Sequence, residues 1–334
     1  MEDTAPLQRM LFDKMKGNFP PHLSLVDEVS YTLDISTDSA YRRIRGEKIL
    51  DLGEIKKLCK KYRISMDTLF QVSDNQLMFS HVKVDDGHFK VKAYLEMLLE
   101  RARTFHTTQD SEMIVIANDI TIFQLLQFPE LAAFKLFFWQ KSSLGFDGFK
   151  DQQFSLEDID ETVLNLSKQI VREYNKISTI EIVGIDAVES FLRQIHYYLE
   201  LGYFKKDSDA LVILEKIEEL VSHFRKEAEV GYKFNHGTEN PSGARGNFTM
   251  YYNELFVIDG IVMVAVGSQK YTYIGTGPLN FIWTADEKFY DSKKIWASKL
   301  MRSSILVSDF SEKERNIYFK KIEKRIHKFR AMLD

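Results

Sequence analysis

Arginines and small polar side chains recur at helical spacing between residues 36 and 48. On a helix that turns about 100° per residue, one side carries Asp38, Ser39, Arg42 and Arg45. Ala40 and Ile44 form the opposite, apolar side, and Tyr41 and Arg43 lie on the flanks. An arginine donates two hydrogen bonds at once to O6 and N7 of a guanine, and a serine bonds to either type of base. The polar side therefore predicts contacts with base edges in the major groove of DNA.

Other basic side chains of this segment suit the phosphate backbone. Arg43, Arg45 and Lys48 are placed to hold phosphates, which fixes the register of a protein on DNA without reading its sequence. Asp38 suits the positive N-terminal end of a helix. It repels phosphate, unless it accepts a hydrogen bond from the N4 of a cytosine.

The local charge supports this interpretation. Between Tyr41 and Arg63 there are nine basic and three acidic residues, a balance of 9 − 3 = +6, although the whole chain carries a net charge of −4. A basic patch on a net negative chain is the pattern expected of a DNA-binding domain. The alternative is that these arginines only solvate an exposed helix.

Three short helices must position the polar side of residues 36–48. Each begins at a residue suited to cap a helix, and the caps are Ser24 with Asp27, Ser36, and Asp51 with Glu54. Gly46 is suited to end the second helix. A small core is expected from Val26, Val29, Leu33, Ile55, Leu58, Cys59 and Tyr62. The order of helix, brief break, helix and third helix predicts a helix-turn-helix module.

Residues 24–70 resemble the lambda-repressor-like helix-turn-helix family, of the Cro or XRE type. The resemblance is carried by Ile35-Ser36, the Arg45-Gly46 pair, the basic helix that follows and residues Ile64 to Leu69. It implies that the second helix enters the major groove from its N-terminal end, with Thr37, Asp38, Ser39 and Arg42 toward the bases. The family usually has an apolar and then an acidic residue before the Arg-Gly pair. Arg43 and Ile44 stand there instead, which would rotate the inward side of the helix by one residue.

Double-stranded DNA is the predicted partner, and members of this family commonly bind it as dimers. A homodimer on two half-sites about one helical turn apart is therefore expected. The predicted DNA-binding residues are Thr37, Asp38, Ser39, Arg42, Arg43, Arg45 and Lys48.

The composition is that of an ordinary globular chain. With 334 residues and 44% hydrophobic content, the sequence is long enough for two or three domains. Cys59 is the single cysteine, which excludes an intramolecular disulfide and fits a reducing compartment. The first residues hold no apolar signal segment, and the longest apolar runs fall well short of the ~20 residues that span a bilayer. We therefore expect a bacterial-type cytoplasmic protein without a membrane span.

The expected fold is mainly α. The expected domains are a helix-turn-helix bundle at 1–72, a linker at 73–88 and a large helical domain at 89–334 with a small antiparallel β-sheet at about 248–284. Apolar residues at spacings of three and four predict helices at Leu7–Phe19, Val91–Phe105, Met113–Phe128, Leu131–Lys141, Leu156–Ile177, Ala187–Leu201, Asp209–Val230, Lys293–Leu306 and Glu312–Leu333.

No pattern in residues 89–334 indicates an enzyme. The histidines form no HExxH spacing for a metal, and there is no Gly-x-Ser-x-Gly elbow of a serine hydrolase. Residues 242–246 lack the ending of a phosphate-binding loop. His196 and Glu200 are four residues apart and able to pair, although a histidine at the surface or core edge is the simpler interpretation. The sequence predicts no catalysis, no metal and no cofactor.

The last predicted helix has two open interpretations. Its apolar residues at helical spacing are Phe319, Ile322, Ile326, Phe329 and Leu333, with basic residues between them. Such a pattern is typical of a dimer seam with a basic flank. It is equally typical of a helix that packs back onto its own domain.

Taken together, the patterns predict a sequence-specific transcriptional regulator. Its C-terminal domain would dimerise and also sense an unknown small-molecule or protein effector, because it is larger than dimerisation alone requires. One alternative is an enzyme or effector that the helix-turn-helix only targets to DNA. Another is a protein-interaction adaptor.

Overall fold

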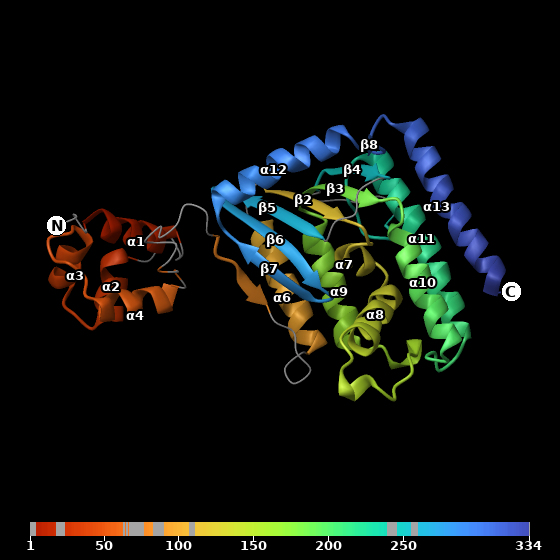
Figure 1. Cartoon of the computed structure of the whole chain (residues 1–334), viewed down its shortest axis with the longest axis horizontal. Coiled ribbons are helices and arrows are strands. Elements are labelled where there is room, and N and C mark those ends of the chain that lie inside the picture. The colour runs from red at the N-terminus through yellow and green to blue at the C-terminus, as the bar shows by residue number, and fades with distance from the viewer. Residues whose placement is uncertain are drawn as a thin grey trace. The chain divides into compact units, whose positions relative to one another are not determined.

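The computed structural model describes residues 5–17, 24–62, 64, 66, 77–82, 90–106, 111–238, 246–254 and 260–333. The chain divides into two compact units, residues 1–78 (unit 1) and 79–334 (unit 2) (Figure 1). Within the predicted linker at 73–88, Ser80–Val82 forms strand β1 of unit 2. Residues 73–76 and 83–89 lie outside the described part of the chain.

All regular secondary structure in the described residues of unit 1 is helical. Its helices are α1 (Ala5–Gly17), α2 (Leu25–Leu33), α3 (Thr37–Ile44) and α4 (Leu52–Tyr62). The predicted caps are confirmed, since the hydroxyl of Ser24 accepts from the Asp27 N–H, and the backbone N–H and side chain of Asp51 bond reciprocally with Glu54. Asp34 ends α2 in the left-handed region at φ 56°, which turns the chain sharply into α3.

The core of unit 1 joins all four helices. Its buried members are Leu11, Phe12, Met15, Val29, Leu33, Ala40, Leu50, Leu58, Cys59, Tyr62 and Ile64. Cys59 is a buried core residue, as its spacing predicted, and burial raises the pKa of its thiol. Helix α1 supplies three of these side chains, so residues before the predicted helix-turn-helix module belong to the same small core.

Unit 2 is built around one mixed sheet. Its described strands are β1 (Ser80–Val82), β2 (Glu112–Ala117), β3 (Ser178–Gly184), β4 (Phe248–Asn253), β5 (Ile261–Val266), β6 (Gln269–Gly277), β7 (Asn280–Thr284) and β8 (Ile305–Leu306). They lie in the order β1-β7-β6-β5-β2-β3-β4-β8. The pairs β2·β3 and β3·β4 are parallel, and the other pairs are antiparallel.

The prediction of a small antiparallel sheet in a mainly α chain is wrong. The sheet has eight described strands. Its central strand β2 comes from a segment that was predicted as helix, and strand β3 fills the gap between two predicted helices, where no strand was predicted. Residues Met113–Ala117 are a continuous apolar run, and strands buried on both faces lack the alternation that distinguishes a strand from a helix. Strand β3 follows α9 after three residues, so the helical pattern before it conceals its start.

The helices of unit 2 agree better with the predictions. They are α6 (Val91–Phe105), α7 (Ile122–Leu125), α8 (Pro129–Phe138) with a π-helical turn at Trp139–Ser143, α9 (Glu161–Tyr174), α10 (Ala187–Glu200), α11 (Ser208–Val230), α12 (Glu287–Arg302) and α13 (Glu312–Leu333), with short 3-10 turns at Asp147–Phe149 and Leu156–Asp158. The predicted bounds of α6 and α13 are confirmed, and those of α10 and α11 are correct to one residue.

Helices cover both faces of this sheet. On one face, Ile114, Ile116 and Met263 pack against Tyr290 and Ala297 of α12. The alternate residues Met113, Val115 and Val264 point to the other face, where they pack against Phe105 of α6 and Tyr174 of α9. The sheet is therefore the middle layer of unit 2.

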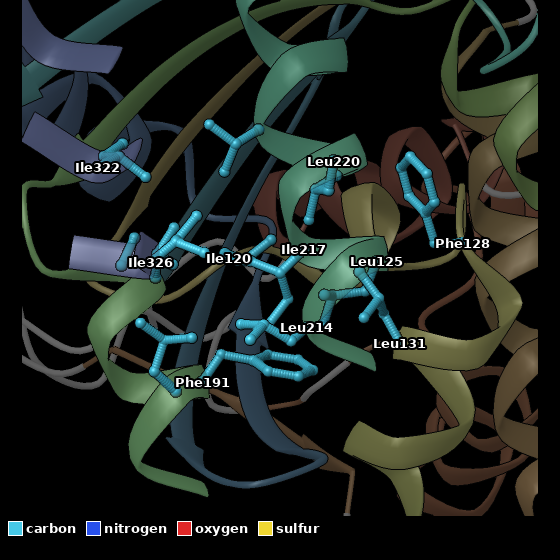
Figure 2. Packing of buried hydrophobic residues seen from close by; sticks show 14 of the residues in the cluster. Ile120, Leu125, Phe128, Leu131, Phe191, Leu214, Ile217, Leu220, Ile322 and Ile326 are labelled. Carbon is cyan, nitrogen blue, oxygen red and sulfur yellow. The ribbon is translucent and has the colours of Figure 1, made fainter. Parts of the chain in front are cut away.

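The largest apolar cluster lies between α8, α10, α11 and α13 (Figure 2). In α13, Phe319, Ile322, Ile326 and Phe329 are all buried in it. Of the two interpretations of this helix, the structure therefore supports packing onto its own domain, and the apolar stripe is not free to form a dimer seam.

Candidate nucleic-acid interface

Helix α3 presents most of the predicted DNA-binding residues to solvent. The Ser36 hydroxyl caps the helix by accepting from the Ser39 N–H at 3.3 Å, and Gly46 ends the turn that follows at φ 80°. Around this capped helix Thr37, Asp38, Arg42, Arg45 and Lys48 are exposed, and Ser39 is half-buried. All seven predicted residues lie on α3 or in the turn after it, and six of them are at least partly exposed.

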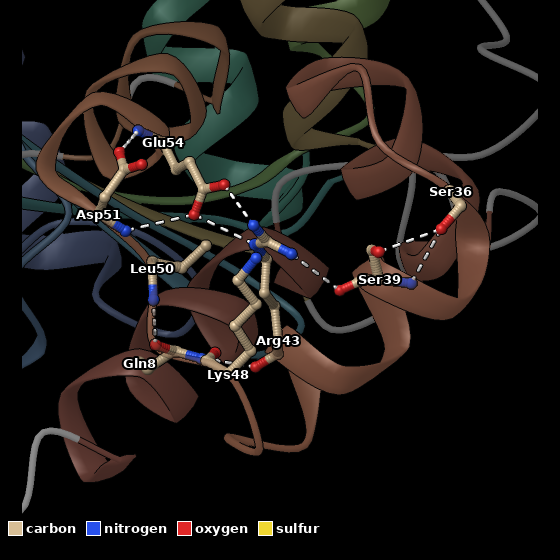
Figure 3. Close-up of polar contacts among 8 residues, drawn as sticks. All are labelled: Gln8, Ser36, Ser39, Arg43, Lys48, Leu50, Asp51 and Glu54. Carbon is tan, nitrogen blue, oxygen red and sulfur yellow. Dashed lines mark hydrogen bonds and ion pairs between the residues drawn. The ribbon is translucent and has the colours of Figure 1, made fainter.

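Arg43 is the exception. Only 4% of it is exposed. Its Nε and Nη2 donate to the carboxylate of Glu54 at 3.1 and 2.5 Å, and its Nη1 donates to the Ser39 carbonyl at 3.2 Å (Figure 3). The side-chain hydrogen bonds of Arg43 lower the pKa of Glu54. Arg43 therefore lies inside unit 1 and does not reach the surface where a phosphate would bind.

The buried side of α3 is rotated relative to the sequence prediction, in which Ala40 and Ile44 formed the inward side. Ala40 and Arg43 are buried, whereas Ile44 is half-buried. This is the rotation that the Arg43-Ile44 departure from the family pattern implied. It leaves Asp38, Arg42 and Arg45 on the outer side of the helix.

An acidic residue lies among the exposed arginines. The carboxylate of Glu47 is 3.9 Å from Nε of Arg42 and 3.8 Å from Nη1 of Arg45. The guanidinium of Arg45 also lies over the Tyr41 ring, 5.0 Å from its centre. All three charged side chains are more than half exposed, so these contacts are weak and open to competition from phosphate.

We expect Glu47→Gln to raise the affinity for duplex DNA. The substitution removes a negative charge that pairs with both arginines, and exposed pairs are worth ~0.2–1 kcal/mol, which corresponds to as much as roughly a fivefold tighter Kd. Fluorescence anisotropy at low salt measures the change. Glu200→Gln on α10 alters the net charge equally at an exposed position and should have no effect. A weaker Kd for Glu47→Gln would instead indicate that Glu47 itself contacts a base.

Gln8 of α1 is a contributor that the sequence did not reveal. Its side chain is 7% exposed and bonds to the backbone of three residues in the segment from Arg43 to Leu50. These partners are 35 to 42 positions away along the chain, and no local pattern reports such a contact. The residue lies before the segment that resembles the helix-turn-helix family.

Unit 2 contains a buried group of charged and polar side chains. Glu181 of β3, Glu227 of α11 and Lys233 are at most 1% exposed. The Tyr174 hydroxyl and Gln124 Nε2 donate to Oε1 of Glu181 at 2.5 and 3.2 Å. Nζ of Lys233 lies 3.6 Å from the centre of the Tyr174 ring and has no hydrogen-bond partner among the described residues. Two carboxylates and one amine are thus enclosed with incomplete hydrogen bonding.

Burial shifts the proton affinities in this group. It lowers the pKa of Lys233 to about 7, although the nearby carboxylates of Glu181 and Glu227 favour the charged amine. Burial also raises the pKa of Glu181. The adjoining cavity, lined by Glu181, Thr121 and apolar side chains, measures about 20 Å³, which is room for roughly one water molecule.

Lys233 should make unit 2 more stable as the pH rises from about 7.5 to 9.5. An unfolded lysine keeps its proton up to its ordinary pKa of about 10.4, so in this range the unfolded chain binds more protons and the free energy of unfolding rises by up to ~1.4 kcal/mol per pH unit. Urea unfolding of wild type and Lys233→Met at several pH values isolates this contribution. Parallel pH profiles of the two proteins would contradict the assignment.

Three further observations concern other features that the sequence raised. Nδ1 of His196 and Oε2 of Glu200 are 3.4 Å apart on the surface of α10, which confirms a solvated pair. Among the described residues, no group of three or more His, Cys, Asp or Glu side chains is arranged to hold a metal ion. None of the described helices is long and apolar enough to cross a bilayer.

Comparison with known proteins adds one match. Residues 14–113 match the family model of the BetR domain. The matched range holds α2, α3 and α4 of unit 1 and continues through β1 and α6 into β2 of unit 2. No curated protein and no solved structure matches the chain. The BetR match and the capped α2–α3 pair together support a helix-turn-helix segment of DNA-binding type in this part of the chain.

Proposed function

We propose that this chain is a sequence-specific DNA-binding transcriptional regulator. The observation that carries the proposal is the exposed polar side of α3, where Arg42 and Arg45 extend from a helix capped at Ser36. Both guanidinium groups are free of buried partners, and a bidentate arginine contact with guanine is the commonest base-specific contact in the major groove. The BetR match supports DNA binding by the same segment.

The exposed residues divide into two expected roles. Thr37, Asp38 and Ser39 lie at the N-terminal end of α3, the end that enters the major groove in the lambda-repressor-like (Cro or XRE) arrangement. Arg42 follows one turn later on the same side. Lys48, in the turn after α3, is exposed and suits a phosphate contact that sets the register of the protein on DNA.

Unit 2 supplies the regulatory part of the proposal. We expect it to act by binding and not by catalysis, as a domain that oligomerises and senses a small-molecule or protein effector in the cytoplasm. A homodimer would place two α3 helices about one helical turn apart on DNA. Because the apolar stripe of α13 is buried in its own domain, the dimer contact must use other surfaces.

The proposal is tested by titrating labelled genomic DNA fragments with the full chain and following fluorescence anisotropy. A regulator binds with an affinity that falls steeply with salt, by a log–log slope of about −0.9 for each phosphate contact. Absence of binding at ~50 mM salt would contradict the proposal, because non-specific binding alone is detectable there, and it would favour a protein-interaction adaptor. Selection of the bound sites from a random pool then gives the recognised sequence.

A further inference from the structure

The backbone between α3 and α4 is held on two sides by largely buried side chains. Glu54, in the first turn of α4, bonds to Arg43 of α3 and also accepts from the Asp51 N–H at 3.2 Å (Figure 3). On the other side, Gln8 of α1 donates to the carbonyls of Arg43 and Lys48 at 2.6 and 2.9 Å. The same Gln8 amide accepts from the Leu50 N–H at 2.9 Å.

These contacts surround the residues that the proposed function assigns to DNA. Arg42 precedes the held carbonyl of Arg43 by one residue, Arg45 follows it by two, and Lys48 supplies the second carbonyl that Gln8 holds. The three helices α1, α3 and α4 are thereby joined at Arg43, whose backbone carbonyl accepts from the Gln8 side chain and whose own side chain donates to Glu54. These bonds hold the backbone that carries the three exposed basic residues.

A need for stability alone does not account for these bonds. A buried ion pair gains little over apolar side chains of similar volume, because desolvation of the two charges offsets their attraction. What the pair does provide is direction: the guanidinium of Arg43 meets Glu54 side-on through two nitrogens, with its third nitrogen on the Ser39 carbonyl. Such a fork has one favourable orientation, whereas an apolar contact tolerates sliding and rotation of α3.

We propose that Gln8, Arg43 and Glu54 are positioning residues for DNA recognition. They hold α3 and the turn after it in one orientation, so that Arg42 and Arg45 meet base edges while Lys48 meets a phosphate. The inference rests on the proposed function and adds to it a source of sequence specificity that never touches DNA. It also gives Arg43 a role inside the protein in place of the predicted phosphate contact.

The test is the double variant Arg43→Met/Glu54→Met, which replaces the ion pair by apolar side chains of similar length. Three quantities are measured on the full chain: the midpoint of thermal unfolding, the Kd for the selected site and the Kd for a scrambled duplex. We expect a midpoint close to that of wild type. The Kd for the scrambled duplex divided by the Kd for the selected site, which measures discrimination, should fall by about tenfold or more. The control is Lys206→Met/Glu157→Met, an exposed pair of unit 2, which should leave the ratio unchanged.

The outcomes separate this inference from the function it rests on. Wild-type affinity and wild-type discrimination in the folded double variant would overturn the positioning role and leave the proposed function intact. Failure of the wild-type chain to bind DNA would overturn both.

If the double variant does not fold, Glu54→Gln carries the test. It keeps an acceptor for the Asp51 N–H but weakens the contact with Arg43, and a threefold or greater loss of discrimination is expected. An unchanged ratio in folded Glu54→Gln would overturn the inference.

Discussion

The double variant Arg42→Ala/Arg45→Ala should bind the selected DNA site at least ~30-fold more weakly than wild type. Each arginine that pairs with a guanine is worth about 1–3 kcal/mol, and a loss of about 2 kcal/mol already corresponds to about 30-fold in Kd. The two side chains are 58% and 65% exposed and support no core contact. Alanine favours helix, so α3 should remain folded and the loss should come from DNA contacts alone.

The salt dependence of the same variant tells base contacts from phosphate contacts. If both arginines read bases, affinity for the selected site falls while affinity for a scrambled duplex changes much less. If both hold phosphates, affinity falls equally on every sequence and the log–log salt slope becomes shallower by roughly 1.8. Arg193→Ala/Arg302→Ala removes the same charge from exposed positions of unit 2 and is the control. Unchanged binding by the α3 variant would exclude α3 as the recognition helix.

The local features of unit 1 could be predicted from sequence because they depend on neighbours within a few residues. Ser36 caps α3 by a bond to the third residue after it, and Asp51 and Glu54 form a reciprocal pair at the same spacing. A helical wheel also uses only the residues of one helix. On such a wheel an arginine is taken to be exposed because its side chain is charged. Arg43 is buried because a carboxylate 11 residues away meets it, and that partner lies beyond what the wheel includes.

The central strands of the sheet in unit 2, in contrast, could not be predicted from sequence periodicity. Helices such as α10 and α11 have one apolar and one polar side, and this periodicity is visible in the sequence. Strand β2 is buried between β5 and β3 and covered on both faces, so neither side of it is polar. Strand β3 even places the carboxylate of Glu181 in the interior, where Tyr174 and Gln124 donate to it. Its pairing depends on long-range contacts that periodicity does not report.

Gly246→Ala should destabilise unit 2 by ~3 kcal/mol or more, well above the loss at an ordinary glycine. A Cβ at this position would lie 1.9 Å from the Ile177 carbonyl oxygen and 2.2 Å from its carbon. Both are backbone atoms next to β3, so no side chain can swing away. Relief requires the chain to move off the Asn175 carbonyl, which accepts the Gly246 N–H at 2.8 Å, and to disturb the register that places Phe248 of β4 opposite Thr179 of β3. Overpacking a fixed backbone contact commonly costs ~1–3 kcal/mol, and the lost hydrogen bond adds about 1 kcal/mol.

Urea unfolding of the full chain measures this effect against a matched control. A Cβ added at Gly148 would meet no atom within 4 Å, and the φ of this residue lies outside the left-handed region. Gly148→Ala should therefore be neutral or slightly stabilising through the unfolded state. A difference near zero between Gly246→Ala and wild type would mean that β3 and β4 do not approach as closely as the parallel pair requires. A large loss in Gly246→Ala alone would support the parallel core of the sheet, which is the part of the fold that the sequence concealed.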